Sequence, residues 1–174
     1  ISIADPTHVP AGIYTQQALL KLNLWNNLNR NKFAEVVVSL IQSIPYSYNI
    51  RGDCNGNNLP QAYKEGIRSG TPCLSFIKHD ILSPLEFFYL KTGDCDSRTV
   101  LIYTILKSFG YDVAILNSDR YSHSMIGINL PSSGKYKIIN GKKYFFWETT
   151  GVGWEMGMLP PDNWDISKWS LALK

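Results

Sequence analysis

The sequence predicts an α+β fold in which one buried helix packs on an antiparallel sheet. Residues 94–109 are apolar nearly all round, which is typical of a helix buried on most faces. The segments that follow, 111–116, 122–130 and 142–148, are rich in β-branched and aromatic residues and therefore favour strands. One helix followed by successive strands indicates an α+β architecture, because a parallel sheet would need helices and strands to alternate.

Length and composition indicate one domain over residues 1–174. The chain has 174 residues, of which 44% are hydrophobic and 13% aromatic, and it is long enough to bury a core of its own. The formal net charge is only +3 and the basic residues are scattered among acids, so no nucleic-acid partner is expected. No apolar stretch approaches the roughly 18 residues of a membrane span, so none is expected. The sequence indicates no oligomeric state.

Two helices are predicted before residue 49. Residues 1–31 form a lead-in with a loose helical spacing of apolar residues over 16–28. Residues 32–43 are the clearer helix, with Asn31 placed to cap it and Pro45 to stop it. The apolar residues at helical spacing in this second segment are Phe33, Val36, Val37, Leu40 and Ile41.

Residues 49–82 are predicted to be a long loop. Helical and strand periodicity disappear there, and Gly, Asn, Pro and Ser accumulate. Long loops in compact domains tend to be functional or covalently tied down. The chain has three cysteines, and an odd count indicates one pair and one free thiol. Cys54 and Cys73 form the natural pair in this loop, with two unpaired thiols as the alternative.

A bridge between the two loop cysteines has a consequence for localisation. Disulfides persist in oxidising compartments. We therefore expect an extracytoplasmic protein, either periplasmic or secreted.

Cys95 is the first helical residue after Asp94, which is placed as the helix cap. Free backbone N–H groups and the positive end of the helix dipole favour a thiolate at this position. The same amides can donate to an oxyanion that develops during a reaction. The pattern indicates a nucleophile, and the alternative is that Cys95 is a small buried hydrophobic residue.

His123 lies on the strand predicted over 122–130. Alternation places His123 and Gly127 on one face of that strand, and the glycine leaves room beside the imidazole. The other two histidines are His8, in a proline-flanked start, and His79, in the predicted loop. His123 is therefore the candidate general base, with a structural histidine as the alternative.

Glu148 ends the aromatic strand predicted over 142–148. On a neighbouring antiparallel strand, a carboxylate can fix the tautomer of an imidazole, as the third group of a triad does. A solvated carboxylate at a strand end is the alternative.

Three short motifs, taken in order, resemble the transglutaminase-like superfamily. Gly93-Asp94-Cys95-Asp96 opens an apolar helix, Tyr121-Ser122-His123-Ser124 opens a strand, and Trp147-Glu148-Thr149-Thr150 ends another. The resemblance covers roughly residues 33–161 and points in particular to the bacterial transglutaminase-like cysteine proteinases. It implies a papain-like α+β fold with Cys95 as nucleophile, His123 as general base and Glu148 as the orienting acid.

The resemblance also implies a role for Gln42, which stands where papain-like enzymes have the oxyanion-hole glutamine upstream of the nucleophile. An exposed helix glutamine is the alternative. Two features depart from the superfamily pattern. Glu148 stands where many members have Asp, and residues 49–82 have no counterpart in the superfamily core.

The activity that the resemblance implies is acyl transfer on amide bonds through a thioester on Cys95. Hydrolysis of a peptide or isopeptide bond in a protein or peptide substrate is expected, without a cofactor. Cross-linking by a transglutaminase is one alternative. A non-catalytic module that binds a peptide or glycan on the same fold is another.

Other motifs are set aside. Residues 53–64 imitate a calcium loop, but Asn58 stands at the position of the required glycine and Lys64 at that of the required glutamate. The two loop cysteines and His79 lack the paired spacing of zinc sites, so no metal is expected. A papain-like cell-wall amidase with a Cys-His-His site would need a histidine after His123, and the sequence has none.

Overall fold

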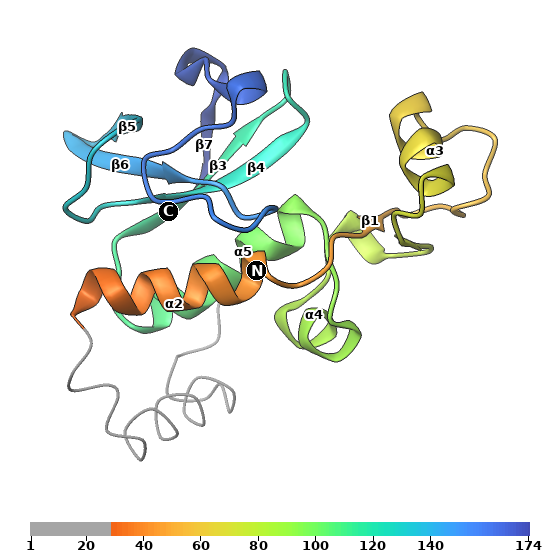
Figure 1. Ribbon diagram of the computed structural model, residues 1–174, viewed down its shortest axis with the longest axis horizontal. Helices are drawn as coiled ribbons and strands as arrows, with labels where there is room; N and C mark the ends of the chain where they lie inside the picture. Colours follow the sequence, from red (N-terminus) through yellow and green to blue (C-terminus); the bar gives the residue numbers. More distant parts are fainter. Residues whose placement is uncertain (1–28) are drawn as a thin grey trace.

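The computed structural model describes residues 29–174, so the helix predicted over 16–28 lies outside the described residues. The elements follow one another along the chain (Figure 1) in the order α2 (Arg30–Gln42), β1 (Tyr48–Asn49), α3 (Gln61–Arg68), β2 (Cys73–Leu74), η3 (Lys78–Asp80), α4 (Pro84–Leu90), α5 (Cys95–Ser108), β3 (Val113–Ser118), β4 (His123–Ile128), β5 (Tyr136–Ile139), β6 (Lys142–Trp147), η4 (Pro161–Asn163), η5 (Ile166–Lys168) and β7 (Ser170–Leu173).

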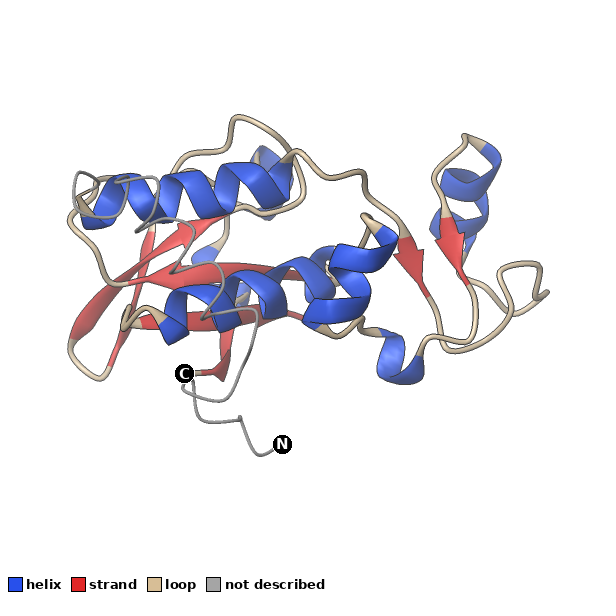
Figure 2. Cartoon of the chain, turned by 90° about the horizontal axis from the view of Figure 1, so that it is seen from below, coloured by secondary structure: helices blue, strands red, loops and turns tan. Residues whose placement is uncertain are grey.

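The molecule consists of a body and an arm. The body contains the five-stranded sheet with α2 and α5, and the arm, residues 48–74, carries α3 between the short strands β1 and β2. Figure 2 shows the arm extending from one end of the body.

The sheet of the body is antiparallel, with the strand order β5-β6-β4-β3-β7. The α+β class is therefore present as the sequence predicts. Asn140 and Gly141 connect β5 to β6, with φ angles of 51° and 76°. Asn and Gly tolerate these left-handed conformations, which a two-residue hairpin turn requires. β5 and β7 were not predicted, because both are short and mostly unburied.

The two faces of the sheet are covered differently. α2 and α5 pack on one face, which contributes Ile115, Ile126 and Trp147 to the main core. The opposite face forms a second core with Trp169, and the buried residues of this second core are Ala114, Leu116, Met125, Ile139, Tyr144, Phe146 and Trp169. Alternation along the strands therefore supplies both cores.

α5 is the buried helix that the sequence predicts. The carboxylate of Asp94 caps it by accepting a hydrogen bond from the Ser97 backbone N–H at 2.9 Å. Gly110, with a φ of 73°, follows its C-terminal end. Ile102 and Leu106 are fully buried against α2 and the sheet.

The start of α2 differs from the prediction. Asn29, not Asn31, is the N-cap, and its side chain accepts from the Lys32 backbone N–H at 2.8 Å. Asn31 lies inside the first turn and donates instead to the carbonyl of Pro131 at 2.9 Å. Two asparagines near one helix start offer the same capping chemistry, and only the backbone conformation decides between them.

Residues 49–82 do not form one long loop. They contain α3, and β1 pairs in parallel with β2. Cys54 and Cys73, the pair expected from the sequence, are joined by a disulfide. α3 has eight residues, none of them buried, and only Tyr63 and Ile67 stand at helical spacing, which is too short a pattern to indicate a helix. α4 was missed as well, although Ser83 and Glu86 form a capping box at its start.

Arg98 fastens α5 to its neighbours. Its side chain is fully buried and donates to the carbonyls of Ile41 at 2.7 Å, Ile44 at 2.6 Å and Gly93 at 3.0 Å. A longer bond of 3.4 Å reaches the carbonyl of Thr149. One guanidinium therefore joins the end of α2, the start of α5 and the segment after β6.

Replacing Arg98 with methionine is expected to lower the free energy of unfolding by about 3 kcal/mol or more, because several buried carbonyls lose their donor. Urea denaturation followed by circular dichroism measures this change. Arg51→Met, at a side chain that is 71% exposed, is the matched control and is expected to change stability by less than about 0.5 kcal/mol. Equal effects of the two substitutions would contradict the structural role of Arg98.

Candidate active site

The Cys95 thiol lies at the start of α5 and is 7% exposed. Its sulfur accepts hydrogen bonds from the backbone N–H groups of Ser124 and Asp96. Burial, followed by the charges of Asp96 and Asp94, nevertheless raises the pKa of Cys95 to about 12. The thiol is therefore protonated at neutral pH in the resting protein, and its use as a nucleophile requires a base.

His123 and Glu148 form a hydrogen-bonded pair, with 2.8 Å between Nε2 of the imidazole and Oε2 of the carboxylate. β4 and β6 bring them together, since Ile126 pairs with Trp147 and Glu148 follows directly. The side chains are 15% and 2% exposed, respectively. Because Nε2 faces the Glu148 carboxylate, the neutral imidazole of His123 carries its proton on Nε2. Its Nδ1 is then free to accept a second proton.

Glu148 is held in its ionised form. Its other oxygen, Oε1, accepts from the backbone N–H groups of Thr149 and Thr150 at 2.8 Å, and from the Thr150 hydroxyl at 2.7 Å. Burial acts to raise the pKa of Glu148, but the hydrogen bond and charge of His123 and the Thr150 bonds together lower it. Glu148 is therefore fixed in place and charged, as an orienting acid must be.

Hydrogen bonds join the start of β4 to the start of α5 beside the Cys95 thiol. The Ser124 hydroxyl donates to the carboxylate of Asp96, and the Ser124 amide bonds the sulfur of Cys95. Ser124 directly follows His123 in β4. The nucleophile candidate therefore lies against the residue next to the base candidate.

Trp169 supports the imidazole from the second core. Its ring meets that of His123 edge to face, with 6.0 Å between the ring centroids, and it also contacts Phe146. Because Trp169 is almost completely buried, it restricts the orientation of the histidine. No local pattern in the sequence distinguishes Trp169 from the other tryptophans of the C-terminal segment.

Gln42 is buried and bonded to the site, but not as an oxyanion donor. Its amide nitrogen donates to the carbonyl of Glu148 at 2.7 Å and to that of Trp154 at 2.9 Å. Both amide hydrogens are engaged, so none is left for an oxyanion. Gln42 instead holds the backbone of Glu148 in place. The candidate donor to an oxyanion is instead the backbone N–H of Cys95, which lies in the first turn of α5 and lacks an intrahelical partner.

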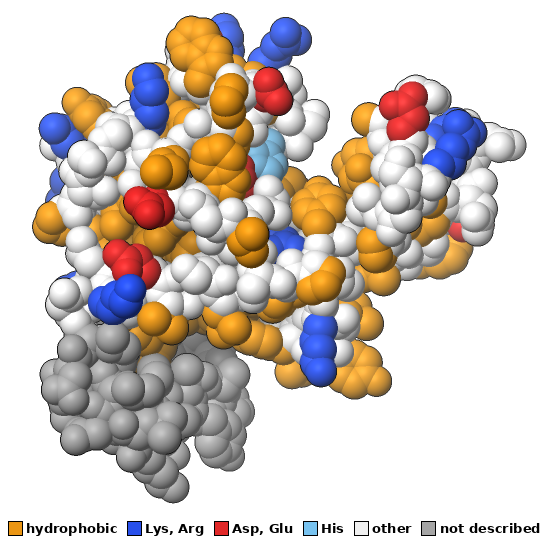
Figure 3. All heavy atoms as spheres, viewed as in Figure 1, with side chains coloured by type: hydrophobic (Ala, Val, Ile, Leu, Met, Phe, Trp, Pro, Cys, Tyr) orange, Lys and Arg blue, Asp and Glu red, His pale blue; other side chains and the backbone are white. Residues whose placement is uncertain are grey.

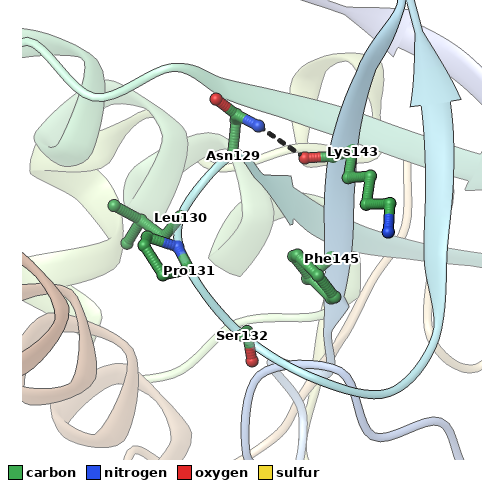
Figure 4. A pocket seen from close by; sticks show the side chains of 6 residues that line it. All are labelled: Asn129, Leu130, Pro131, Ser132, Lys143 and Phe145. Carbon is green, nitrogen blue, oxygen red and sulfur yellow. Dashed lines mark hydrogen bonds between the residues drawn. The ribbon is translucent and has the colours of Figure 1, made fainter.

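A depression elsewhere on the molecule is not part of this site (Figure 4). It has a volume of about 460 Å³ and lies at the end of β4 opposite to His123. The residues that line it are Asn129, Leu130, Pro131, Ser132, Lys143 and Phe145. Only one of these side chains is ionisable, so the depression has no acid–base pair.

Metal ligands do not gather in the part of the chain that the structure describes. Within residues 29–174, no three His, Cys, Asp or Glu side chains lie close enough together to hold a metal ion. Cys54 and Cys73 are bonded to each other, so they are not thiolate ligands. None of the helices within the same residues has the length and apolar character that a membrane crossing requires.

Comparison with known proteins assigns no family. No family model matches the sequence, and no solved structure matches it significantly. A stretch of 54 residues is 41% identical to the molybdate-binding protein ModA of Haemophilus influenzae. This match covers 29% of the chain and only 21% of that protein's length, so it describes a local similarity.

Asp94 provides a pH-dependent test of the site's burial. Burial, opposed by its bonds to Ser97, raises the pKa of Asp94 from 3.8 to about 6. The folded protein therefore holds an extra proton between these values, and the stability linked to Asp94 falls as the pH rises from about 4 to about 6. Asn at this position keeps a capping oxygen but does not titrate.

The free energy of unfolding of wild type, minus that of Asp94→Asn, is expected to fall by about 2–3 kcal/mol from pH 4 to pH 6, at about 1.4 kcal/mol per pH unit. Urea titrations across this range measure the difference. Asp162→Asn, at an exposed aspartate, serves as control. A difference between wild type and Asp94→Asn that stays constant with pH would show that the carboxyl is not buried as described.

Proposed function

We propose that this protein is a cysteine-nucleophile enzyme that hydrolyses an amide bond in a peptide or protein substrate. The observation that carries the proposal is the His123–Glu148 pair, with 2.8 Å between its atoms, beside a free thiol at a helix N-terminus. The order of the three motifs, which resembles that of the transglutaminase-like superfamily, supports the same activity. On this proposal the body is a papain-like arrangement of helix and sheet.

The raised pKa of Cys95 favours one form of the mechanism. The thiol is not ionised in advance, so Nδ1 of His123 takes its proton while the sulfur attacks the carbonyl carbon. The backbone N–H of Cys95 stabilises the oxyanion that develops. His123 then gives its proton to the leaving amine as the carbon–nitrogen bond breaks, and a thioester remains on Cys95.

The second half of the reaction regenerates the enzyme. His123 removes a proton from a water molecule that attacks the thioester, the carbon–sulfur bond breaks, and the thiol recovers its proton. Glu148 stays ionised throughout and stabilises the imidazolium in both halves. If an amine replaces water, the product is a new amide, which is the transglutaminase reaction.

The disulfide supports a location for this activity. The Cys54–Cys73 bond is of the kind that persists outside the reducing cytoplasm. We infer an extracytoplasmic enzyme, periplasmic or secreted, that acts on proteins or peptides there.

Hydrolysis is tested with a defined library of synthetic peptides whose cleavage is read by mass spectrometry. Wild type is expected to cleave a subset of them, and Cys95→Ala none. His123→Gln and Glu148→Gln are each expected to lower kcat/KM by about 10²-fold or more, because the base or its orientation is lost.

His79→Gln is the matched control, since His79 is exposed and lies on η3, and it is expected to retain full activity. A parallel reaction with added cadaverine shows whether an amine competes with water. Cleavage that survives in Cys95→Ala would refute the proposed nucleophile. Peptide binding without any cleavage would favour a non-catalytic module.

A further inference from the structure

The arm leaves a hollow between itself and the body, and Figure 3 shows this hollow on the face that it displays. The parallel pairing of β1 with β2, the Cys54–Cys73 disulfide and the hydrogen bond from the Cys54 backbone N–H to the Ser75 hydroxyl hold the ends of the arm together. No residue of α3 is buried. A helix that adds nothing to a core, yet is covalently held in place, is more readily explained by a function in recognition.

Three tyrosines, Tyr46, Tyr48 and Tyr63, form a continuous group that we call the tyrosine wall. The rings of Tyr48 and Tyr63 stack with 4.5 Å between centroids, and those of Tyr46 and Tyr48 meet edge to face at 5.7 Å. Gly66 permits this contact with α3, because a Cβ there would lie 2.2 Å from the Tyr48 hydroxyl. The wall therefore links α3 to the segment that precedes β1.

The tyrosine wall lies close to the thiol. Tyr46 pairs with Gly93 in an isolated parallel bridge, two residues before Cys95. Burial raises the pKa of Tyr46, and the charge of an ionised Cys95 raises it next. The pKa of Tyr63 is raised by the same two causes in the same order. The bridge and the electrostatic coupling agree in placing two of the phenols near the proposed nucleophile.

A negative charge without a cationic partner accompanies the wall. Asp96 is partly exposed and accepts a hydrogen bond from the neutral Ser124 hydroxyl. No Lys or Arg forms an ion pair with Asp96 among residues 29–174. Arg98, two residues further along α5, is fully buried and donates to backbone carbonyls. Its guanidinium lies 5.8 Å from the centroid of the Tyr46 ring, so the faces of the wall left for another cation are those of Tyr48 and Tyr63. Aromatic faces beside such a carboxylate complement a cation.

We propose that the tyrosine wall and Asp96 form a subsite for a lysine or arginine side chain of the polypeptide whose amide bond Cys95 attacks. This inference rests on the proposed function and names its substrate class. An apolar side chain would fit the rings but would desolvate Asp96 without pairing it, which is unfavourable. A bound cation would also oppose the negative charges beside Cys95 and so help the thiol to lose its proton.

The test measures binding to the inactive Cys95→Ala variant by isothermal titration calorimetry. The ligands are blocked hexapeptide amides in which one position carries lysine, its neutral analogue norleucine, arginine, or its neutral analogue citrulline. Each charged peptide is expected to bind about tenfold more tightly than its neutral analogue, and the preference should shrink at high salt. Because no turnover is needed, a failure of catalysis cannot be mistaken for a failure of this subsite.

Further substitutions in the Cys95→Ala protein show which side chains produce the preference for charged peptides. Tyr63→Leu and Asp96→Asn are each expected to reduce it severalfold, whereas Tyr63→Phe keeps the aromatic face and retains it. Tyr89→Leu, at a tyrosine on α4 that is 84% exposed, is the control and should bind as Cys95→Ala alone does. Equal binding of charged and neutral peptides, binding of neither, or a preference that survives both Tyr63→Leu and Asp96→Asn would overturn the proposal.

Discussion

The candidate site depends on the buried guanidinium of Arg98. Its donors reach the carbonyls of Ile41 and Ile44 at the end of α2 and of Gly93 before α5. A weaker bond reaches Thr149, which directly follows Glu148. A planar group with several fixed donors suits this task, because it sets the directions of its partners as well as their distances. Gln42 repeats the connection from α2 to Glu148 through its side-chain amide.

Burial acts to raise the pKa of both Cys95 and Glu148, but only for Glu148 do neighbouring groups outweigh it. It makes the Cys95 thiol a weak acid, because the nearby carboxyl groups of Asp94 and Asp96 add to the cost of a buried thiolate. Glu148 is ionised despite its burial, because three donors from Thr149 and Thr150 and the imidazole of His123 compensate for the lost water. The site therefore holds an oriented imidazole beside a protonated thiol. Such a pair would stay unreactive until a substrate carbonyl, and on our proposal a substrate cation, enters.

The fold class was predictable from local signals, and the three triad candidates were brought together by the order of their motifs. The Asp94 cap, the apolar run of α5 and the Asn140-Gly141 turn each depend on interactions between residues close in sequence. The pairing of His123 with Glu148 needed only the expectation that their strands are antiparallel neighbours. The Cys54–Cys73 bond was predictable as a choice among three cysteines, although its alternative could not be dismissed.

The features that were missed depend on contacts between distant segments. α3 has no buried face, so its sequence looks like a loop. The role of Gln42 depends on the carbonyls of Glu148 and Trp154, more than a hundred positions away. Trp169 packs on His123 only because β7 joins the edge of the sheet beside β3. No local sequence pattern specifies such contacts, because it does not tell which distant segment a buried donor or aromatic ring will meet.

Trapping the acyl enzyme would test whether His123 activates the buried thiol of Cys95 for acyl transfer. Wild type and His123→Gln would each be mixed with the p-nitrophenyl ester of a blocked lysine and quenched in acid after increasing times. Intact-protein mass spectrometry would then measure the fraction of acylated enzyme. Wild type is expected to gain the mass of one acyl group on Cys95, and His123→Gln to gain it about 10²-fold more slowly. No adduct on Cys95, or equal rates in the two proteins, would contradict this activation.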